Sequence, residues 1–115
     1  MRNMSFSLTT PQIQDETKTV TRRLGWKFLK AGDCVRPVVK AMGLKKGEKV
    51  QPIRGPLRIV DVRREPLHMV TQEALATAKE GFPDMGAFEF ISMFCKHMKV
   101  RSNKIITRIE FEYTD

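Results

Sequence analysis

The sequence predicts an α+β fold, namely a small curled β-barrel of mixed or antiparallel strands with two main helices packed against it. Three observations support this. Several short segments alternate apolar and polar residues, helical periodicity is confined to residues 71–98, and no strand–helix–strand unit repeats. The 115 residues also match the roughly 100–150 residues of one domain, so residues 1–115 are expected to form a single domain.

The first part of the chain predicts short elements. Residues 5–8 alternate as a brief strand. Thr10 suits an N-cap and Pro11 a first helical position, so a short helix is expected to run to Asp15. Residues 17–21 are rich in β-branched side chains and are expected to be extended.

The next segment combines a turn, a strand and a basic loop. Residues 24–30 lack clean alternation and predict a turn or short helix, followed by a tight turn at residues 31–33. Residues 34–42 predict a strand. Pro37 has no amide donor, so this strand is expected to lie at an edge or to begin pairing after that point. Glycines and lysines then break regular structure over residues 43–49.

Two longer strands are expected at residues 57–64 and 104–113. The first should place Arg58, Val60 and Val62 on one face and Leu57, Ile59 and Asp61 on the other. It is expected to pair antiparallel with the preceding strand. The second alternates almost perfectly, with Ile105, Thr107, Ile109, Phe111 and Tyr113 on one face and Arg108, Glu110 and Glu112 on the other.

Two helices are expected between these strands. Thr71 is a suitable N-cap for a helix over residues 71–79, and Gly81 suits its C-terminal end. Asp84 can cap a second helix. Its apolar stripe would consist of Phe88, Ile91, Phe94 or Cys95, and Met98.

The positive charge is concentrated in one segment. The chain carries 21 Lys and Arg against 13 Asp and Glu, a net charge of +8. Residues 18–64 alone sum to +11, whereas residues 1–17 sum to −1 and residues 65–115 to −2. Half of the cations in the basic segment are arginines, which pair well with phosphate, so the segment favours RNA or a nucleotide as partner. A solvated charged surface is the alternative.

Several other classes of protein are not indicated. No apolar run approaches the roughly 18 residues of a membrane span, and no signal-peptide pattern is present, so a cytoplasmic protein without membrane contacts is expected. Cys34 and Cys95 are far apart and predict reduced thiols. Together with His68 and His97 they match no common zinc spacing, so neither a metal nor a cofactor is expected.

The densest polar cluster is Thr17–Arg23, which contains one amine, three hydroxyls and two guanidiniums. These groups suit phosphate binding. They also allow catalysis, with Thr21 as nucleophile or proton relay and Lys18 as base, provided that burial or the neighbouring arginines lower the pKa of Lys18. Residues 18 and 21 face opposite sides of a regular strand, so Lys18 must lie at a bend or before the strand. A threonine-rich strand with solvated cations is the structural alternative.

These residues, followed by Trp26, Leu29 and the Gly32–Asp33 turn, resemble the ASCH domain family, which has a PUA-like β-barrel fold. In the family's G-x-K-x-x-T-x-R pattern, the Lys, Thr and Arg fall on Lys18, Thr21 and Arg23, and Glu16 stands where Gly is usual. Glu16 is expected to change the turn and to put an anion beside the pocket. The later parts of the resemblance are Glu80–Phe82, the helix containing Phe88, and the strand around Ile109–Phe111.

The resemblance implies several activities. Small members of the family include amidohydrolases that deacetylate N4-acetylcytidine with the motif's Lys and Thr and a Glu between the two helices, which by position is Glu80. Other members are proposed to bind or to cleave RNA. The opening at residues 7–11 and the loop at residues 43–47 resemble compact versions carried by bacteriophages or prophages, for which the compartment would be the host cytoplasm.

Our leading interpretation is an RNA- or nucleotide-binding domain with a basic cleft between the barrel and the helices. The expected nucleic-acid contacts are Lys18, Arg22, Arg23, Trp26, Lys45, Lys46, Lys49 and Arg54. Trp26 is equally compatible with a place in the core. The alternatives are the amidohydrolase with Thr21 as nucleophile, Lys18 as base and Glu80 as acid, a ribonuclease, and a protein-binding module. Convergence of Lys18, Thr21 and Glu80 in one pocket would favour an enzyme over a binding domain.

Overall fold

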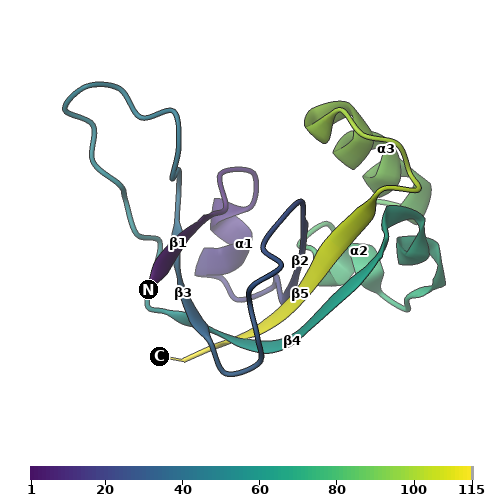
Figure 1. The fold of residues 1–115 in the computed structure, drawn as a ribbon, viewed down its shortest axis with the longest axis horizontal. Helices are drawn as coiled ribbons and strands as arrows, with labels where there is room; N and C mark the ends of the chain where they lie inside the picture. Colours follow the sequence, from purple (N-terminus) through teal and green to yellow (C-terminus); the bar gives the residue numbers. More distant parts are fainter. Residues whose placement is uncertain (115) are drawn as a thin grey trace.

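The computed structural model describes residues 1–114 and contains one mixed five-stranded sheet, with all helices but the first gathered at one end (Figure 1). The strands are β1 (Arg2–Ser5), β2 (Val20–Arg23), β3 (Cys34–Val38), β4 (Leu57–Pro66) and β5 (Ile105–Tyr113). The helices are α1 (Thr10–Gln14), the 3₁₀ helix η1 (Leu67–Gln72), α2 (Ala76–Lys79) and α3 (Ala87–Met98). These elements confirm the α+β class.

The sheet is curved but does not close into the predicted barrel. Its strand order is β1-β3-β4-β5-β2, with β1 parallel to β3 and every other neighbouring pair antiparallel. Strands β1 and β2 therefore form the two edges. In the described part of the chain, no ladder joins these edges.

The β4–β5 pair is the longest ladder, and a bulge corrects the predicted faces of β4. The register shifts between Ile59 and Asp61, so one extra residue enters β4 at that point. A bulge of this kind moves the following side chains to the opposite face. Val62 consequently packs against the same core as Ile59, instead of facing the other way.

Strand β3 lies inside the sheet, between β1 and β4, and not at the predicted edge. Its pairing with β4 is limited to Cys34 and Val35, before Pro37 is reached. On the other side, β1 pairs with residues 35–38 of β3. The proline is tolerated because β3 meets β4 only ahead of the position that lacks an amide donor.

The helix predicted over residues 71–79 is divided into η1 and the single-turn α2. Leu75, just before α2, has a left-handed backbone with φ of 58° and is 74% exposed. Ala76 is the buried residue of α2. The chain therefore bends where the sequence pattern suggested a continuous helix.

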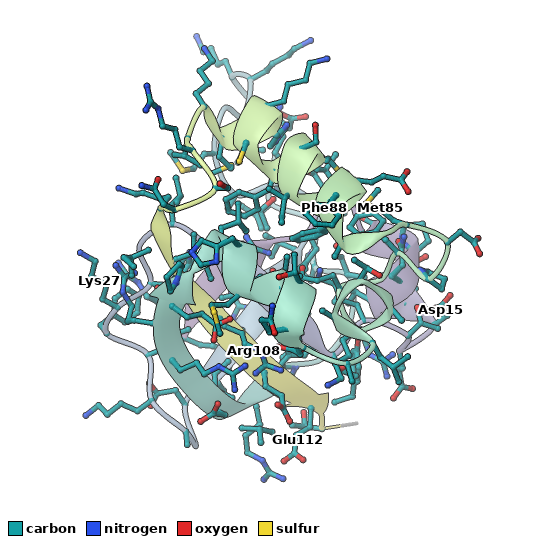
Figure 2. The ribbon with its side chains drawn as sticks, turned by 90° about the vertical axis from the view of Figure 1, so that its right-hand side faces the viewer. Asp15, Lys27, Met85, Phe88, Arg108 and Glu112 are labelled. Atoms are coloured by element: carbon teal, nitrogen blue, oxygen red, sulfur yellow. The ribbon has the colours of Figure 1, made fainter. Side chains whose placement is uncertain are left out.

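The second predicted helix exists, but its buried stripe and its cap differ from those expected. Helix α3 begins after Gly86, whose amide donates to the Glu89 carboxylate at 3.1 Å, and not after Asp84. Phe94 is buried as expected, but Phe90 is buried and Phe88 is 79% exposed on the side of the molecule seen in Figure 2. The stripe is displaced because η1 and α2 contact α3 from the side of Phe90 and Phe94.

Two hydrophobic cores lie on opposite faces of β5. One contains Ile109 and the other Ile106, as the alternation of a strand requires. The first core joins the sheet to α1 and includes Met4, Phe6, Ile13, Leu29, Val35, Leu57, Ile59 and Phe111. The second lies beneath the helices and includes Leu67, Val70, Ala76, Phe90 and Phe94. Strand β2 pairs with β5 and so runs along the boundary between them.

The backbone at Leu75 generates a stability prediction. A side chain in the left-handed region costs roughly 1 kcal/mol relative to glycine, so Leu75→Gly should raise the free energy of unfolding by about that amount. Leu75→Ala is the matched control because it removes the exposed side chain but keeps the Cβ atom. Chemical denaturation of both variants tests the prediction, and equal stabilities would show that the backbone conformation is not the cause.

Candidate functional site

Lys18 lies in a turn that precedes β2, which removes the geometric difficulty of placing residues 18 and 21 on one side. The strand begins only at Val20. The turn is fixed by two backbone amides, since Thr17 and Lys18 both donate to the carbonyl of Gln12, at 3.0 and 3.2 Å. Glu16 has φ of 64°, the left-handed conformation that favours glycine, the residue usual at this position of the family pattern.

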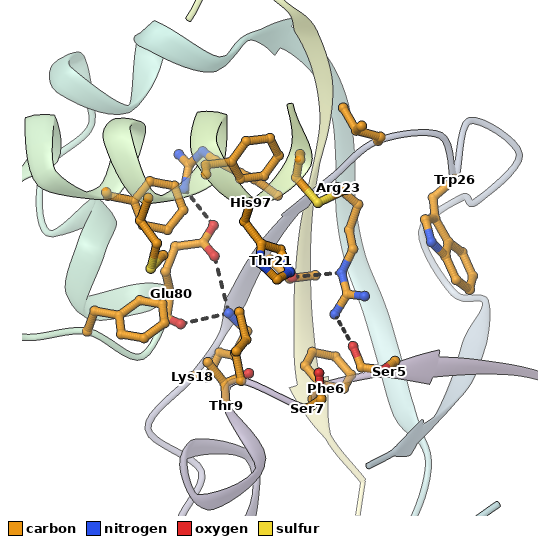
Figure 3. Close-up of a pocket in the computed structure, with 18 residues that line it drawn as sticks. Ser5, Phe6, Ser7, Thr9, Lys18, Thr21, Arg23, Trp26, Glu80 and His97 are labelled. Carbon is orange, nitrogen blue, oxygen red and sulfur yellow. Dashed lines mark hydrogen bonds and ion pairs between the residues drawn. The ribbon is translucent and has the colours of Figure 1, made fainter. Parts of the chain in front are cut away.

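Glu80 approaches the same point from the end of α2. The Thr19 amide donates to the Lys79 carbonyl at 2.8 Å and ties the two segments together. Lys18 Nζ donates to the Glu80 backbone oxygen at 2.6 Å and to Glu80 Oε1 at 3.2 Å (Figure 3). Both residues are only 3% exposed. This is a buried ion pair formed by residues 62 positions apart.

A second carboxylate, the partly buried Glu73, completes the charge network. Arg22 donates to Glu80 Oε2 at 2.9 Å and to Glu73 Oε1 at 2.8 Å. Arg108 donates to the two Glu73 oxygens at 2.7 and 3.1 Å, and Arg63 adds a bond of 3.1 Å. The network therefore runs from Lys18 through Glu80 and Arg22 to Glu73 and Arg108.

Sequence reasoning missed Glu73 and the burial of Arg108. Arg108 lies on the face of β5 opposite Ile109, a face predicted to carry only charged residues, yet it is 3% exposed. Figure 2 shows it beside α2. The sequence does show two glutamates, Glu73 and Glu80, at the ends of the predicted helix. It does not show that both bind Arg22, which is more than 50 residues away in the sequence.

Burial changes the protonation of the cations in this site. Desolvation lowers the pKa of Lys18 below its usual value, because it outweighs the opposing charge of Glu80, and the positive charges of Arg23 and Arg22 act in the same direction. Desolvation also lowers the pKa of Arg23 to about 10, against the influence of Glu80. Lys18 is thus easier to deprotonate than an exposed lysine, whereas Arg23 stays charged at neutral pH.

Thr21 and Arg23 form the other half of the site. Arg23 Nε donates to Thr21 Oγ1 at 3.0 Å, and its NH2 group donates to the Ser5 carbonyl at 2.6 Å. The guanidinium also lies 4.7 Å from the ring centroid of Phe6. Within residues 1–114, no carboxylate lies within 4.0 Å of it. Two hydrogen bonds therefore fix the position of the Arg23 guanidinium, and no ion pair with a carboxylate of residues 1–114 compensates its charge.

One pocket of about 350 Å³ brings these groups together. Lys18, Thr21, Arg23 and Glu80 line it, as Figure 3 shows. Much of the remaining wall is aromatic and comes from both hydrophobic cores, with Phe6 from one and Phe82, Phe90 and Phe94 associated with the other. The three residues proposed for catalysis thus converge. The volume is within the roughly 300–1,000 Å³ typical of small-molecule sites.

The remaining predicted nucleic-acid residues have different positions. Arg22 lines the pocket, but its side chain has no exposed surface and bonds to two carboxylates. Trp26 lines the pocket at its edge. Lys45, Lys46 and Lys49 are exposed on the segment between β3 and β4, which Figure 1 shows on the opposite side of the molecule from α3, and they do not line the pocket.

Arg54 and Glu16 belong to another contact. Arg54 lies 4.8 Å from the Tyr113 ring centroid and donates to the Ile13 carbonyl at 3.3 Å. Its guanidinium is 3.4 Å from the Glu16 carboxylate. The anion at position 16 therefore pairs with Arg54 and does not line the pocket, contrary to the expectation from the sequence.

Part of the +11 charge is compensated by ion pairs within the chain, some of them buried and some at the surface. Among the fourteen cations of residues 18–64, five form ion pairs with carboxylates of residues 1–114. Four of these cations pair with carboxylates after residue 64, and the fifth, Arg54, pairs with Glu16. The five cations are Lys18, Arg22, Arg54, Arg58 and Arg63. The basic segment and the acidic second half thus partly complement each other.

Cys34 and Cys95 are both free thiols, as predicted. Across residues 1–114, no three His, Cys, Asp or Glu side chains are grouped so as to hold a metal ion. No helix in the same range has the length and apolar character to cross a bilayer.

Comparison with solved structures identifies the fold. A DUF984 protein from Enterococcus faecalis V583 superposes with a TM-score of 0.65 and 16% identity, over 99% of this chain and 82% of that one. The ASCH domain from Lactobacillus crispatus JV V101 superposes with a TM-score of 0.57 and 16% identity, over 96% and 77% of the two chains. No family model and no curated protein matches the sequence. The chain has an ASCH-like fold.

The Glu73 network predicts a specific dependence of stability on pH. Burial by itself would raise the pKa of Glu73, but the bonds and charges of Arg108, Arg22 and Lys79 hold it below the usual value. The ionised Glu73 therefore stabilises the folded protein fully above the carboxyl pKa of the unfolded chain, about 4.3. This stabilisation is lost as the pH falls through the lower pKa that Glu73 has in the folded protein. Glu73 is partly buried, so Glu73→Gln should cost about 1–2 kcal/mol at pH 7, less than the loss of a partner from a fully buried pair, and this difference should shrink below pH 4.

Denaturant unfolding of the wild type and Glu73→Gln at several pH values measures that effect. Glu112→Gln is the matched control, because Glu112 pairs with Arg58 at the exposed surface, where ion pairs contribute roughly 0–1 kcal/mol. A Glu73→Gln cost that does not change with pH would contradict the electrostatic explanation.

Gly81 supplies a prediction about the turn that carries Glu80. It has φ of +96°, and a Cβ atom there would lie 3.0 Å from Gln12 Cγ and 3.5 Å from Lys18 Cβ. Gly32 has φ of +94° with open space around it. Gly81→Ala should therefore destabilise the fold by about 1–3 kcal/mol more than Gly32→Ala. Thermal unfolding of Gly81→Ala and Gly32→Ala separates the effect of crowding from that of backbone strain. Equal losses of stability in the two variants would exclude crowding as a cause.

Proposed function

We propose that this protein is an amidohydrolase that binds an N4-acylated cytidine-type nucleoside in the pocket and removes the acyl group. The observation that carries the proposal is the convergence of Lys18, Thr21 and Glu80 on one partly enclosed pocket. The resemblance to the ASCH family supports the same three residues. The RNA-binding role remains the second candidate, because the fold is shared with an ASCH domain.

The pocket suits a nucleoside better than a nucleic-acid backbone. Its aromatic walls offer planar apolar surface for a base. The buried cations Lys18 and Arg22 already bond to Glu80, so they are poorly placed to neutralise several phosphates. This arrangement is typical of a site that orients one small group for chemistry.

Each residue has a defined role in the proposed reaction. Thr21 Oγ1 attacks the acyl carbon, and its proton passes to a neutral Lys18 Nζ. The C–N bond then breaks, and Glu80 relays the proton from Lys18 to the departing amine nitrogen. An ester of Thr21 remains, which water hydrolyses with Lys18 again as base, releasing the carboxylic acid and restoring the hydroxyl group.

The surroundings of these residues assist the reaction. The lowered pKa of Lys18 favours the neutral amine that a base requires. The bond from Arg23 to Thr21 Oγ1 stabilises the developing negative charge on that oxygen and leaves the threonine proton available for transfer. Arg22 bonds to the Glu80 oxygen that Lys18 does not use, so both carboxylate oxygens are oriented.

Turnover of N4-acetylcytidine, followed by chromatography, tests the proposal. Lys18→Arg keeps the charge but removes the base, so it should lower kcat by about 10²–10⁴-fold. Thr21→Ala should abolish turnover while retaining binding, and Thr21→Ser should keep measurable activity. For the wild type, kcat should rise with pH until Lys18 is deprotonated.

Lys45→Ala serves as the control, since Lys45 is exposed and lies outside the pocket lining. Absence of turnover in the wild type, or undiminished turnover in Lys18→Arg, would refute the amidohydrolase. Shortening of RNA that is lost in both Thr21→Ala and Lys18→Arg would instead support the ribonuclease alternative.

A further inference from the structure

A second and larger cavity adjoins the pocket. It has a volume of about 960 Å³ and shares Arg23, Trp26 and His97 with the pocket. From this common wall it continues to Arg2 on β1 and Lys40 on the segment after β3. We call the part outside the pocket, lined by Arg2, Trp26, Phe28, Lys40 and Met42, the flanking groove. The amidohydrolase mechanism uses none of these five residues.

The flanking groove and its junction with the pocket carry positive charge without a compensating anion in their lining. Arg2, Arg23 and Lys40 line the cavity, and none of its lining residues in the described chain is Asp or Glu. Arg23 is held in place by Thr21 and Ser5. The charge therefore favours an anionic ligand that continues outward from the pocket.

The same groove exposes flat aromatic surface. The rings of Trp26 and Phe28 lie 5.5 Å apart between centroids. The guanidinium of Arg2 lies 4.3 Å from the Phe28 centroid and 6.0 Å from that of Trp26. Phe28 is 49% exposed. Aromatic rings combined with arginine planes stack on nucleic-acid bases, while the same arginine attracts the phosphate.

The backbone that carries Trp26 is strained. Gly25 and Trp26 have φ of 75° and 53°, so two successive residues adopt the left-handed conformation directly after β2 and Leu24. Residues with a Cβ atom rarely adopt it, and such strain clusters at functional sites. Here it turns the chain so that the indole lines both cavities.

We propose that the flanking groove binds the phosphate and the neighbouring base attached to the nucleoside in the pocket, so that a single-stranded oligonucleotide is bound more tightly than a free nucleoside. The identity of the nucleoside in the pocket rests on the proposed function. The shared chemistry is a phosphate ester, which belongs either to a terminal phosphate or to a continuing strand, and the choice of ligands separates these two sources.

Titration with four ligands at low and high salt provides the test. The ligands are cytidine, cytidine 5′-monophosphate, cytidine 3′-monophosphate and the trinucleotide ApCpA. Trp26 is the single tryptophan of the chain, so its fluorescence reports directly on the groove, and calorimetry gives the affinities. The trinucleotide should bind at least tenfold more tightly than cytidine. Its log–log salt slope should be about −1.4, for two neutralised phosphates.

Variants of the groove test the location. Arg2→Ala/Lys40→Ala should reduce trinucleotide affinity about tenfold, and Phe28→Ala at least fivefold. Cytidine affinity should stay within twofold in all of them. Lys45→Ala/Lys46→Ala removes the same charge from exposed residues outside the groove and should leave both affinities within twofold of the wild type.

The outcomes distinguish this inference from the proposed function. If cytidine binds and the trinucleotide binds no more tightly, or if the groove variants leave the trinucleotide unaffected, the inference is wrong while the amidohydrolase stands. If either cytidine monophosphate binds as tightly as the trinucleotide, the groove recognises a terminal phosphate and not a continuing strand, and the inference is also overturned. If N4-acetylcytidine is not hydrolysed but groove-dependent trinucleotide binding is observed, the proposed reaction fails and the flanking groove stands.

Discussion

The charge network from the buried Lys18, Glu80 and Arg22 to the partly buried Glu73 is the constraint on which the rest of the site depends. Charged groups are removed from water here, so each must find partners within the protein. The turn before β2 and the end of α2 meet because their charges satisfy one another. Loss of a carboxylate from this chain would leave cations buried without compensation.

This network also explains why the pocket lies between two hydrophobic cores. Strand β2 carries Arg22 toward the helical side, where Glu73 and Glu80 lie, and Arg23 toward Ser5 on β1. Successive side chains of a strand alternate in this way. The two neighbouring arginines therefore serve different purposes, one neutralised inside the fold and one directed to the pocket and the adjoining groove.

The charge asymmetry of the sequence acquires a different meaning in the folded chain. The +11 segment first suggested a continuous binding surface. Several of its cations instead pair with carboxylates of the second half, including Glu73, Glu80 and Glu112. Within residues 1–114, the cations that line the cavities without a carboxylate partner, such as Arg23 and Lys40, are few and local. Position relative to a cavity, and not net charge, therefore selects the candidate ligand contacts.

The α+β class, the long strand β5 and the existence of α3 could be predicted from the sequence, because periodicity is a property of neighbouring residues. The motif residues Lys18, Thr21 and Arg23 were indicated by the polar cluster at Thr17–Arg23 and by the resemblance to the ASCH family. Only the tertiary structure decided the open sheet, the interior place of β3, the shift from Phe88 to Phe90 and the partnership of Glu73 with Arg108. These features depend on which distant segments cover each face. A strand residue such as Arg108 looks solvent-exposed until its partner Glu73, 35 residues away in the sequence, is brought against it by the fold.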